Sequence, residues 1–158
     1  MTEQQHDEQE SELDRIVANI AEMLAEQDNE TYSPKVIHEF KNPSNLAHMD
    51  DPDGQGISDG LCGDTMMVCL KIEDGRISRC TFETDGCGAT VACGSMLTRI
   101  AAGMSLEDAS NIDPEQVLSA LDGLPEGHRH CATLAVIALK NAVRDFVKRQ
   151  AADAEEGG

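Results

Sequence analysis

The chain has 158 residues, a length that fits one globular domain with an appendage. It carries 30 acidic and 12 basic residues, and this balance excludes a nucleic-acid binder, which needs a basic surface to displace phosphate counterions. The net charge of -18 also argues against a membrane surface and favours basic protein partners and cations. The polar, acidic start is unlike a signal peptide, and no apolar run is long enough to span a bilayer, so we expect a cytoplasmic protein.

Residues 1–31 are predicted to form an acidic extension, since they hold ten of the 30 acidic residues and one of the 12 basic ones. Within them, apolar residues recur at the spacing of an amphipathic helix over residues 12–27. These apolar residues are Leu13, Ile16, Val17, Ile20, Met23 and Leu24. The helix is expected to pack on its own domain or in a homodimer, with docking of a partner protein as the alternative.

Residues 32–150 are predicted to form the main domain, followed by a disordered tail over residues 151–158. The clearest strand signal is the alternation of apolar side chains over residues 66–73. The Asp-Gly pair at 74–75 favours a two-residue hairpin turn, after which a second strand returns over residues 76–83.

The remaining residues of the domain are predicted to be mostly helical. The expected helices cover residues 32–41, 89–102, a short stretch after Ser105, 114–121 and 131–149. Residues 45–63, rich in Asp, Gly and Ser, are predicted to be a loop with one short strand. The expected fold is therefore α+β, a small antiparallel β-sheet with helices packed on one face, plus the extra N-terminal helix.

Six cysteines are present, and no pair of them has the C-x-x-C spacing of a zinc ribbon or a thioredoxin-type site. In a reducing compartment they are expected to be thiols, metal ligands or redox groups rather than structural disulfides. Cys69, Cys80 and Cys93 fall inside predicted strands or a predicted helix. These three are expected to pack in the interior as small apolar side chains.

Cys62, Cys87 and Cys131 each lie where a predicted element begins or ends. Glycine neighbours let the backbone approach a ligand closely, and a helix N-terminus stabilises a thiolate. Asp64 and His130 lie beside them in the sequence, and soft thiolates with one His or Asp suit zinc or an iron–sulfur cluster. The spacing fits a shared metal or cluster site, and it also fits unrelated buried or reactive thiols.

Several motifs occur in the same order as in a known family. They are the opening segment YSPKVIHEFKNPSN at 32–45, Cys62-Gly63-Asp64, FETDGCGA at 82–89 and HCATLA at 130–135. The chain therefore resembles the IscU/NifU N-terminal type of iron–sulfur cluster assembly scaffold, of SufE/NifU-like fold, over about residues 32–149.

The resemblance implies a scaffold rather than an enzyme. Such a protein accepts persulfide sulfur from a cysteine desulfurase, combines it with iron in a transient [2Fe–2S] or [4Fe–4S] cluster, and transfers the cluster to apo-proteins. It implies that Cys62, Cys87 and Cys131 bind iron and that Asp64 or His130 completes the site. It also implies that Cys131 accepts the persulfide and that zinc can occupy the apo form. A mixed ligand set holds iron less strongly than four thiolates, which suits a carrier that releases its product.

Two departures bear on partners and alternatives. Leu124-Pro125-Glu126-Gly127-His128 stands where the family carries the chaperone-recognition motif L-P-P-V-K, and the missing second proline and lysine put recognition by an Hsp70-type chaperone in doubt. The zinc-dependent SufU branch is also similar, but it carries an insertion before the third cysteine and lacks the preceding His, whereas this chain has His130. A zinc-bound sulfur relay, a structural zinc module and a thiol oxidoreductase are the alternative functions.

Overall fold

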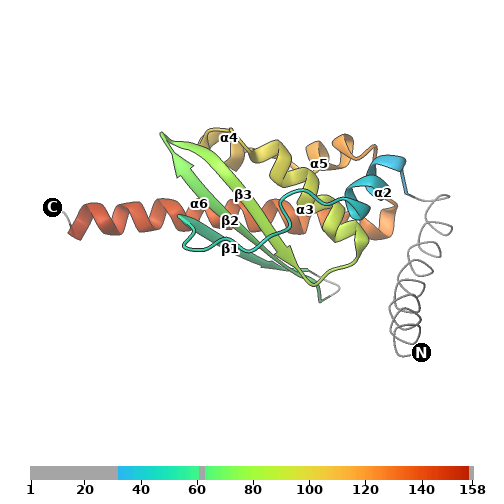
Figure 1. Cartoon of the computed structure of the whole chain (residues 1–158), viewed down its shortest axis with the longest axis horizontal. Coiled ribbons are helices and arrows are strands. Elements are labelled where there is room, and N and C mark those ends of the chain that lie inside the picture. Colours follow the sequence, from blue (N-terminus) through green and yellow to red (C-terminus); the bar gives the residue numbers. More distant parts are fainter. Residues whose placement is uncertain (1–31, 61–62, 157–158) are drawn as a thin grey trace, which may run out of the picture.

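The computed structural model describes residues 32–60 and 63–156 (Figure 1). In chain order its elements are α2 (Pro34–Lys41), β1 (Gly54–Asp59), β2 (Thr65–Glu73), β3 (Arg76–Thr84), α3 (Gly88–Ala101), α4 (Leu106–Ser110), α5 (Pro114–Ala120), the 3-10 turn η1 (Glu126–His128) and α6 (His130–Glu156). The amphipathic helix predicted over residues 12–27 lies outside the described residues, as does Cys62.

The three strands form one antiparallel sheet in the order β1-β2-β3. The predicted hairpin is confirmed, because β2 and β3 are joined by Asp74 and Gly75, whose φ angles of 53 and 74 are both positive. A type I′ turn requires that conformation at both central residues, and the Asp-Gly pair tolerates it. The short strand expected within residues 45–63 is β1, which pairs with β2 from Gly54↔Leu70 to Asp59↔Thr65.

The helices α3 and α6 cover one face of the sheet (Figure 1), which confirms the predicted α+β arrangement. The core between these layers contains Phe82 of β3, Leu97 of α3 and Leu139 of α6, all nearly inaccessible to solvent. Strand β1 lies directly on α6, because a Cβ at Gly54 or Gly56 would overlap the α6 backbone. Helix α6, which begins at His130, therefore supports the edge of the sheet.

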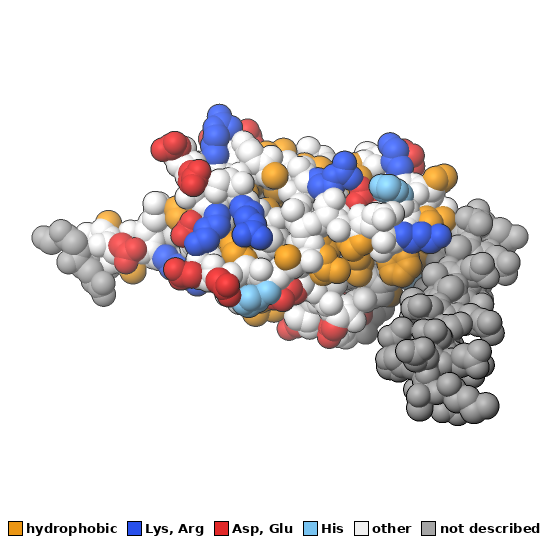
Figure 2. All heavy atoms as spheres, viewed as in Figure 1, with side chains coloured by type: hydrophobic (Ala, Val, Ile, Leu, Met, Phe, Trp, Pro, Cys, Tyr) orange, Lys and Arg blue, Asp and Glu red, His pale blue; other side chains and the backbone are white. Residues whose placement is uncertain are grey.

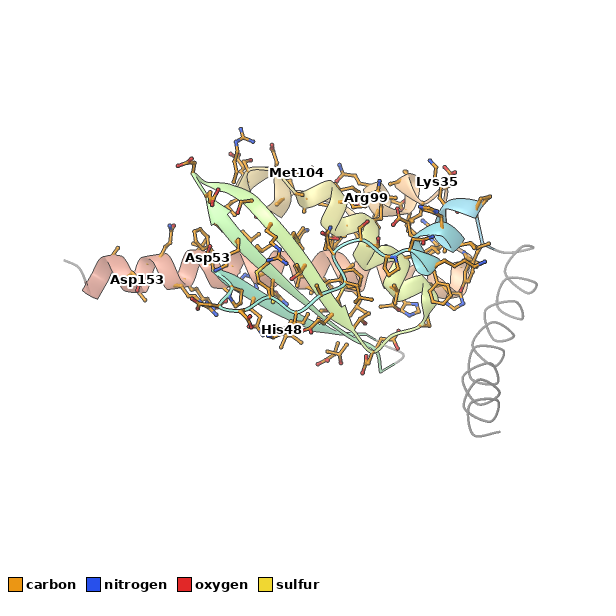
Figure 3. All side chains as sticks on the ribbon, viewed as in Figure 1. Lys35, His48, Asp53, Arg99, Met104 and Asp153 are labelled. Carbon is orange, nitrogen blue, oxygen red and sulfur yellow. The ribbon has the colours of Figure 1, made fainter. Side chains whose placement is uncertain are left out.

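Helix α2 is fixed to α3 by a buried charge. Glu39 is 3% exposed, accepts a hydrogen bond of 2.5 Å from Ser95 Oγ and forms an ion pair with Arg99. Figure 3 shows Arg99 on α3, on the side nearest α2. A buried carboxylate must be paired, so this contact fixes how α2 lies on α3.

The predicted short helices are confirmed, and their N-terminal caps differ in detail. Ser105 caps α4 by accepting the Asp108 N–H at 3.1 Å. Helix α5 has a reciprocal capping box, in which the Asp113 side chain accepts a backbone N–H and the Gln116 side chain accepts the Asp113 N–H. Gln fills this role as Glu does, because its side-chain oxygen also accepts.

The C-terminal end differs from the prediction, because α6 continues to Glu156 where a disordered tail over residues 151–158 was expected. The sequence after Arg149 contains three alanines and no Gly or Pro before Gly157, so helix propensity outweighs the acidic composition. Within the described residues, no helix has the length and apolar character needed to cross a membrane.

Candidate functional site

Two helix N-termini meet at the end of the molecule beside α2 (Figure 1). Cys87 is the N-cap residue of α3, and Cys131 is the second residue of α6. Neither helix has an acidic residue in its first turn, although the chain as a whole is strongly acidic. The partial positive charge of both helix ends is therefore available to stabilise thiolates.

Both glycines beside Cys87 make room for protein side chains. A Cβ at Gly86 would lie 2.6 Å from the Thr90 side chain, and a Cβ at Gly88 would lie 3.0 Å from the Phe40 ring. The sequence suggested that these glycines admit a ligand. The described atoms that need this space belong instead to Thr90 and Phe40, so the glycines set the position of Cys87 on its helix.

Thr90 links the two sulfur atoms to a carboxylate. Its side chain is fully buried, and its hydroxyl lies 3.6 Å from Cys87 Sγ and 3.4 Å from Cys131 Sγ. The same hydroxyl donates to Asp64 Oδ2 at 3.0 Å. Thr90 was not predicted as a site residue, although its position three residues after Cys87 on a helix places both side chains on one face.

Asp64 reaches this point from the start of β2. The turn before it is closed by hydrogen bonds from Gly60 N–H to the Asp64 carbonyl at 2.7 Å and from Gly63 N–H to the Gly60 carbonyl at 3.1 Å. Gly63 has a φ of +82, which explains the glycine after the first cysteine. The structure thus places Asp64 beside Thr90, whereas Cys62 lies outside the described residues.

Two groups of side chains have the spacing of metal ligands. The ligand atoms of Asp64, His130 and Cys131 lie within 4.8 Å of one another, and His130 Nε2 is 3.8 Å from Cys131 Sγ. The ligand atoms of Cys87, His128 and Cys131 also lie within 4.8 Å of one another. The structure therefore brings together four of the five predicted site residues, Asp64, Cys87, His130 and Cys131. It adds His128, whose place in the sequence is within the altered chaperone-recognition motif.

The two sulfur atoms share one proton unequally. A hydrogen bond from Cys131 lowers the pKa of Cys87 to about 4, with further lowering by the Thr90 side chain and the first backbone N–H groups of α3. The same hydrogen bond, together with burial, raises the pKa of Cys131. Cys87 is exposed and Cys131 is 0% exposed, so without metal the accessible sulfur is a thiolate and the buried sulfur is a thiol.

The other three cysteines take no part in this site. Cys69, Cys80 and Cys93 are at most 3% exposed, which confirms that they pack in the interior. Burial raises the pKa of all three thiols, to about 12 for Cys80 and Cys93. Neither donor group among the described residues includes any of them.

The donor set has a definite chemical preference. Thiols and imidazoles with a single carboxylate suit Zn²⁺ and iron, whereas Mg²⁺ and Ca²⁺ prefer oxygen ligands alone. The side chains on the face shown in Figure 2 mix acidic and basic groups rather than forming a field of one sign. The described donor residues are therefore candidate ligands for a transition-metal ion.

The chain belongs to the NifU-like N-terminal domain family, whose model matches residues 31–153. This match confirms the family resemblance inferred from the motifs. A relative from Archaeoglobus fulgidus, named iron–sulfur cluster assembly scaffold protein IscU 1, is 40% identical over 119 residues, covering 75% of this chain and 78% of that protein. An IscU scaffold protein from Azotobacter vinelandii is 41% identical over 120 residues, covering 73% of this chain and 93% of that protein.

A solved structure supports the fold independently. The N-terminal part of a NifU-like protein from Brucella abortus superposes with a TM-score of 0.58 at 20% identity, covering 74% of this chain and 94% of that structure. At this identity the likeness shows the architecture alone. The α+β fold with a three-stranded antiparallel sheet is thus that of NifU-like proteins.

The unequal sharing of the proton predicts a difference in alkylation. In the metal-free, reduced protein, iodoacetamide is expected to modify Cys87 well before Cys131, because Cys87 is an exposed thiolate and Cys131 is a buried thiol. Its rate should change little between pH 9 and pH 6, whereas the rate of an ordinary thiol of pKa about 8.5 falls close to tenfold per unit in the lower part of that range. Peptide mass spectrometry at each pH gives the two rates.

The Cys87→Ser variant is the control for this measurement, since Cys131 should stay slow in it as long as the fold is intact. Faster labelling of Cys131 than of Cys87 in the wild-type protein would contradict the assigned exposures.

Proposed function

We propose that this chain is a scaffold on which iron–sulfur clusters are assembled and from which they are transferred to apo-proteins. The observation that carries the proposal is the meeting of Cys87 and Cys131 at two helix N-termini, with Asp64, His128 and His130 around them. The relatives named as IscU scaffolds support it, since they match this chain at about 40% identity. The proposal describes a carrier of cluster rather than an enzyme.

Iron and sulfur are the substrates of this reaction, and the protein supplies the ligands that hold them. Sulfur delivered as a persulfide becomes cluster sulfide only after a reductant supplies two electrons. Cys62, Cys87 and Cys131 are the proposed thiolate ligands, and Asp64 or His130 is the proposed fourth. The exposure of Cys87 supports this role, because an acceptor must reach the cluster to displace the scaffold's ligands. The carboxylate supports it as well, since a hard oxygen ligand binds thiolate-ligated iron less strongly than sulfur does.

The proposed sulfur acceptor is Cys131, as the family resemblance implies. The Cys131 thiol first gives its proton to the Cys87 thiolate to which it is hydrogen-bonded. Its sulfur then attacks the outer sulfur of a persulfide on the desulfurase; the outer sulfur forms a bond to Cys131, and the desulfurase cysteine leaves as a thiolate. Because Cys131 is 0% exposed, this step requires a local movement that uncovers it. Cys87 is the second candidate, favoured by its exposure and by the lowered pKa that makes it the better nucleophile at neutral pH.

The proposed partners follow from this chemistry. They are a cysteine desulfurase that donates sulfur and apo-proteins that accept the cluster. Docking by an Hsp70-type chaperone is not part of the proposal, because its motif is altered at Glu126 and His128, in the η1 turn.

Anaerobic reconstitution tests the function directly. Incubation with Fe²⁺, cysteine, a cysteine desulfurase and dithiothreitol as the two-electron reductant is expected to give the wild-type protein bound iron and acid-labile sulfide, with the visible absorption of a cluster. Cys87→Ser and Cys131→Ser should lose most of both, because each removes a thiolate ligand. Cys69→Ser is the control, since that buried thiol lies in β2 and belongs to neither donor group.

Metal analysis of the same samples separates the rival functions. Stoichiometric zinc with persulfide transfer and no acid-labile sulfide would contradict the scaffold proposal and favour a zinc-bound sulfur relay. Zinc that cannot be removed without unfolding, with no sulfur acceptance, would indicate a structural zinc module instead.

Replacement of Asp64 is expected to slow cluster release. In Asp64→Ala the exchange-prone oxygen ligand is missing, so the reconstituted cluster should persist longer in the presence of a chelator than it does in the wild-type protein. The decay of visible absorption after chelator addition measures this. Asp59→Ala is the matched control, because the Asp59 carboxylate accepts a hydrogen bond from Thr65 Oγ1 at 2.9 Å and belongs to neither donor group. Faster decay in Asp64→Ala would refute the proposed role.

Persulfide mapping identifies the acceptor. After incubation with a desulfurase and cysteine without iron, mass spectrometry of trapped peptides is expected to find the added sulfur on Cys131, and Cys131→Ser should not accumulate it. Sulfur found on Cys87 in the wild-type protein, and lost only in Cys87→Ser, would move the assignment to the exposed thiolate.

A further inference from the structure

The ligand atoms at the site fall into two groups rather than one shell. Cys87, His128 and Cys131 form one group, Asp64 and His130 form the other with Cys131, and within each group the atoms lie within 4.8 Å of one another. A tetrahedral ion with metal–sulfur bonds near 2.3 Å and metal–nitrogen bonds near 2.0 Å needs donor atoms about 3.5–3.8 Å apart. Each group is close to that spacing for a single ion, and Cys131 is common to both.

We propose that His128 is a metal ligand and that Cys87, His128 and Cys131 form a binding position for a divalent transition-metal ion, Fe²⁺ or Zn²⁺. This position is distinct from the one that Asp64 and His130 share with Cys131. The inference rests on the proposed function only in that both use the same two cysteines.

The structure fixes the His128 ring in a way that suits a ligand. His128 ends the η1 turn, and its backbone N–H donates to the Pro125 carbonyl at 2.8 Å. Its ring packs edge-on against the Tyr32 ring, with centroids 5.4 Å apart and planes at 71°. With its backbone fixed in the turn and its ring packed against Tyr32, the side chain loses less freedom when it binds metal, which favours binding.

The charges around His128 also favour a cation. The family motif has lysine at this position, and a protonated lysine has no lone pair for a metal and repels it. Imidazole, unlike a lysine ammonium, has a ring nitrogen that can donate a lone pair to a metal ion. The adjacent Arg129 is bound to Glu115 of α5 at 2.7 Å, so the nearest fixed positive charge in the sequence is neutralised outside the group.

The two metal-binding positions have the Cys131 sulfur in common. An ion bound by Cys87 and His128 moves to Asp64 and His130 by exchanging two ligands while Cys131 stays bound. The first position includes the exposed sulfur, and so it is the one that an incoming ion meets.

Metal affinity tests the role of His128 without any assay of cluster assembly. The reduced, metal-free full chain is titrated anaerobically with Zn²⁺ against a chromophoric chelator, and with Co²⁺ while the visible spectrum is recorded. His128→Ala and His128→Gln are each expected to weaken Zn²⁺ binding by about tenfold or more, since even partners that only support a ligand contribute 10–100-fold. The sulfur-to-Co²⁺ and ligand-field bands should change with them. His128→Lys, which restores the family residue, should behave in the same way.

His48→Ala is the control, because His48 lies in the segment before β1, where it pairs with Asp50 and Glu83 (Figure 3). Unchanged far-UV circular dichroism and thermal unfolding of the His128 variants show that the loss is local. Wild-type affinity and spectrum in both His128→Ala and His128→Gln, with loss in Cys87→Ser, would overturn this inference and leave the scaffold proposal intact. Affinity that depends on His128 in a protein that never acquires acid-labile sulfide would support this inference and overturn the scaffold proposal.

Discussion

The close packing of α3 against α6 is the constraint from which the site follows. Both helices present fully or nearly buried alanines where they meet the core, among them Ala89 and Ala92 of α3 and Ala132 and Ala135 of α6. Small side chains let the backbones of α3 and α6 approach each other, so the N-termini of the two helices lie side by side. Cys87 and Cys131, 44 residues apart in the sequence, come within hydrogen-bonding distance of one hydroxyl because of this packing. Strand β1, seated on α6 through Gly54 and Gly56, supports the same helix from the other side.

The local charge of the helix ends at the site differs in sign from the net charge of the chain. The protein has a net charge of -18, yet the first turns of α3 and α6 contain no acidic residue. The helix ends can therefore stabilise sulfur anions that a uniformly acidic surface would repel. Asp64 is the one carboxylate that enters the donor groups, and it is held by the Thr90 hydroxyl rather than by a basic side chain. Because no ion pair holds Asp64 among residues 32–60 and 63–156, its carboxylate remains available to a metal ion.

The proposed function requires the protein to bind metal and sulfur and also to release them, and the described site has features that suit both steps. One sulfur is buried and hydrogen-bonded, while the other is exposed on a helix cap. The donors mix sulfur, nitrogen and oxygen and are divided into two groups around Cys131. Among the described residues, such an arrangement offers two partial ligand sets that share Cys131. Ligand exchange is then easier than at a site closed by four thiolates.

Structural features that depend on residues close together in the chain could be predicted from the sequence. Alternation over residues 66–73 and the Asp-Gly turn sufficed for the hairpin, and the helix predicted over residues 114–121 corresponds to α5. The family motifs likewise singled out Asp64, Cys87, His130 and Cys131 before their positions were known. The role of Thr90, the unequal states of the two thiols and the membership of His128 in a donor group were decided only by the tertiary structure. These properties arise between segments far apart in the chain, because hydrogen bonds, burial and metal-ligand spacing depend on distances that no local pattern encodes.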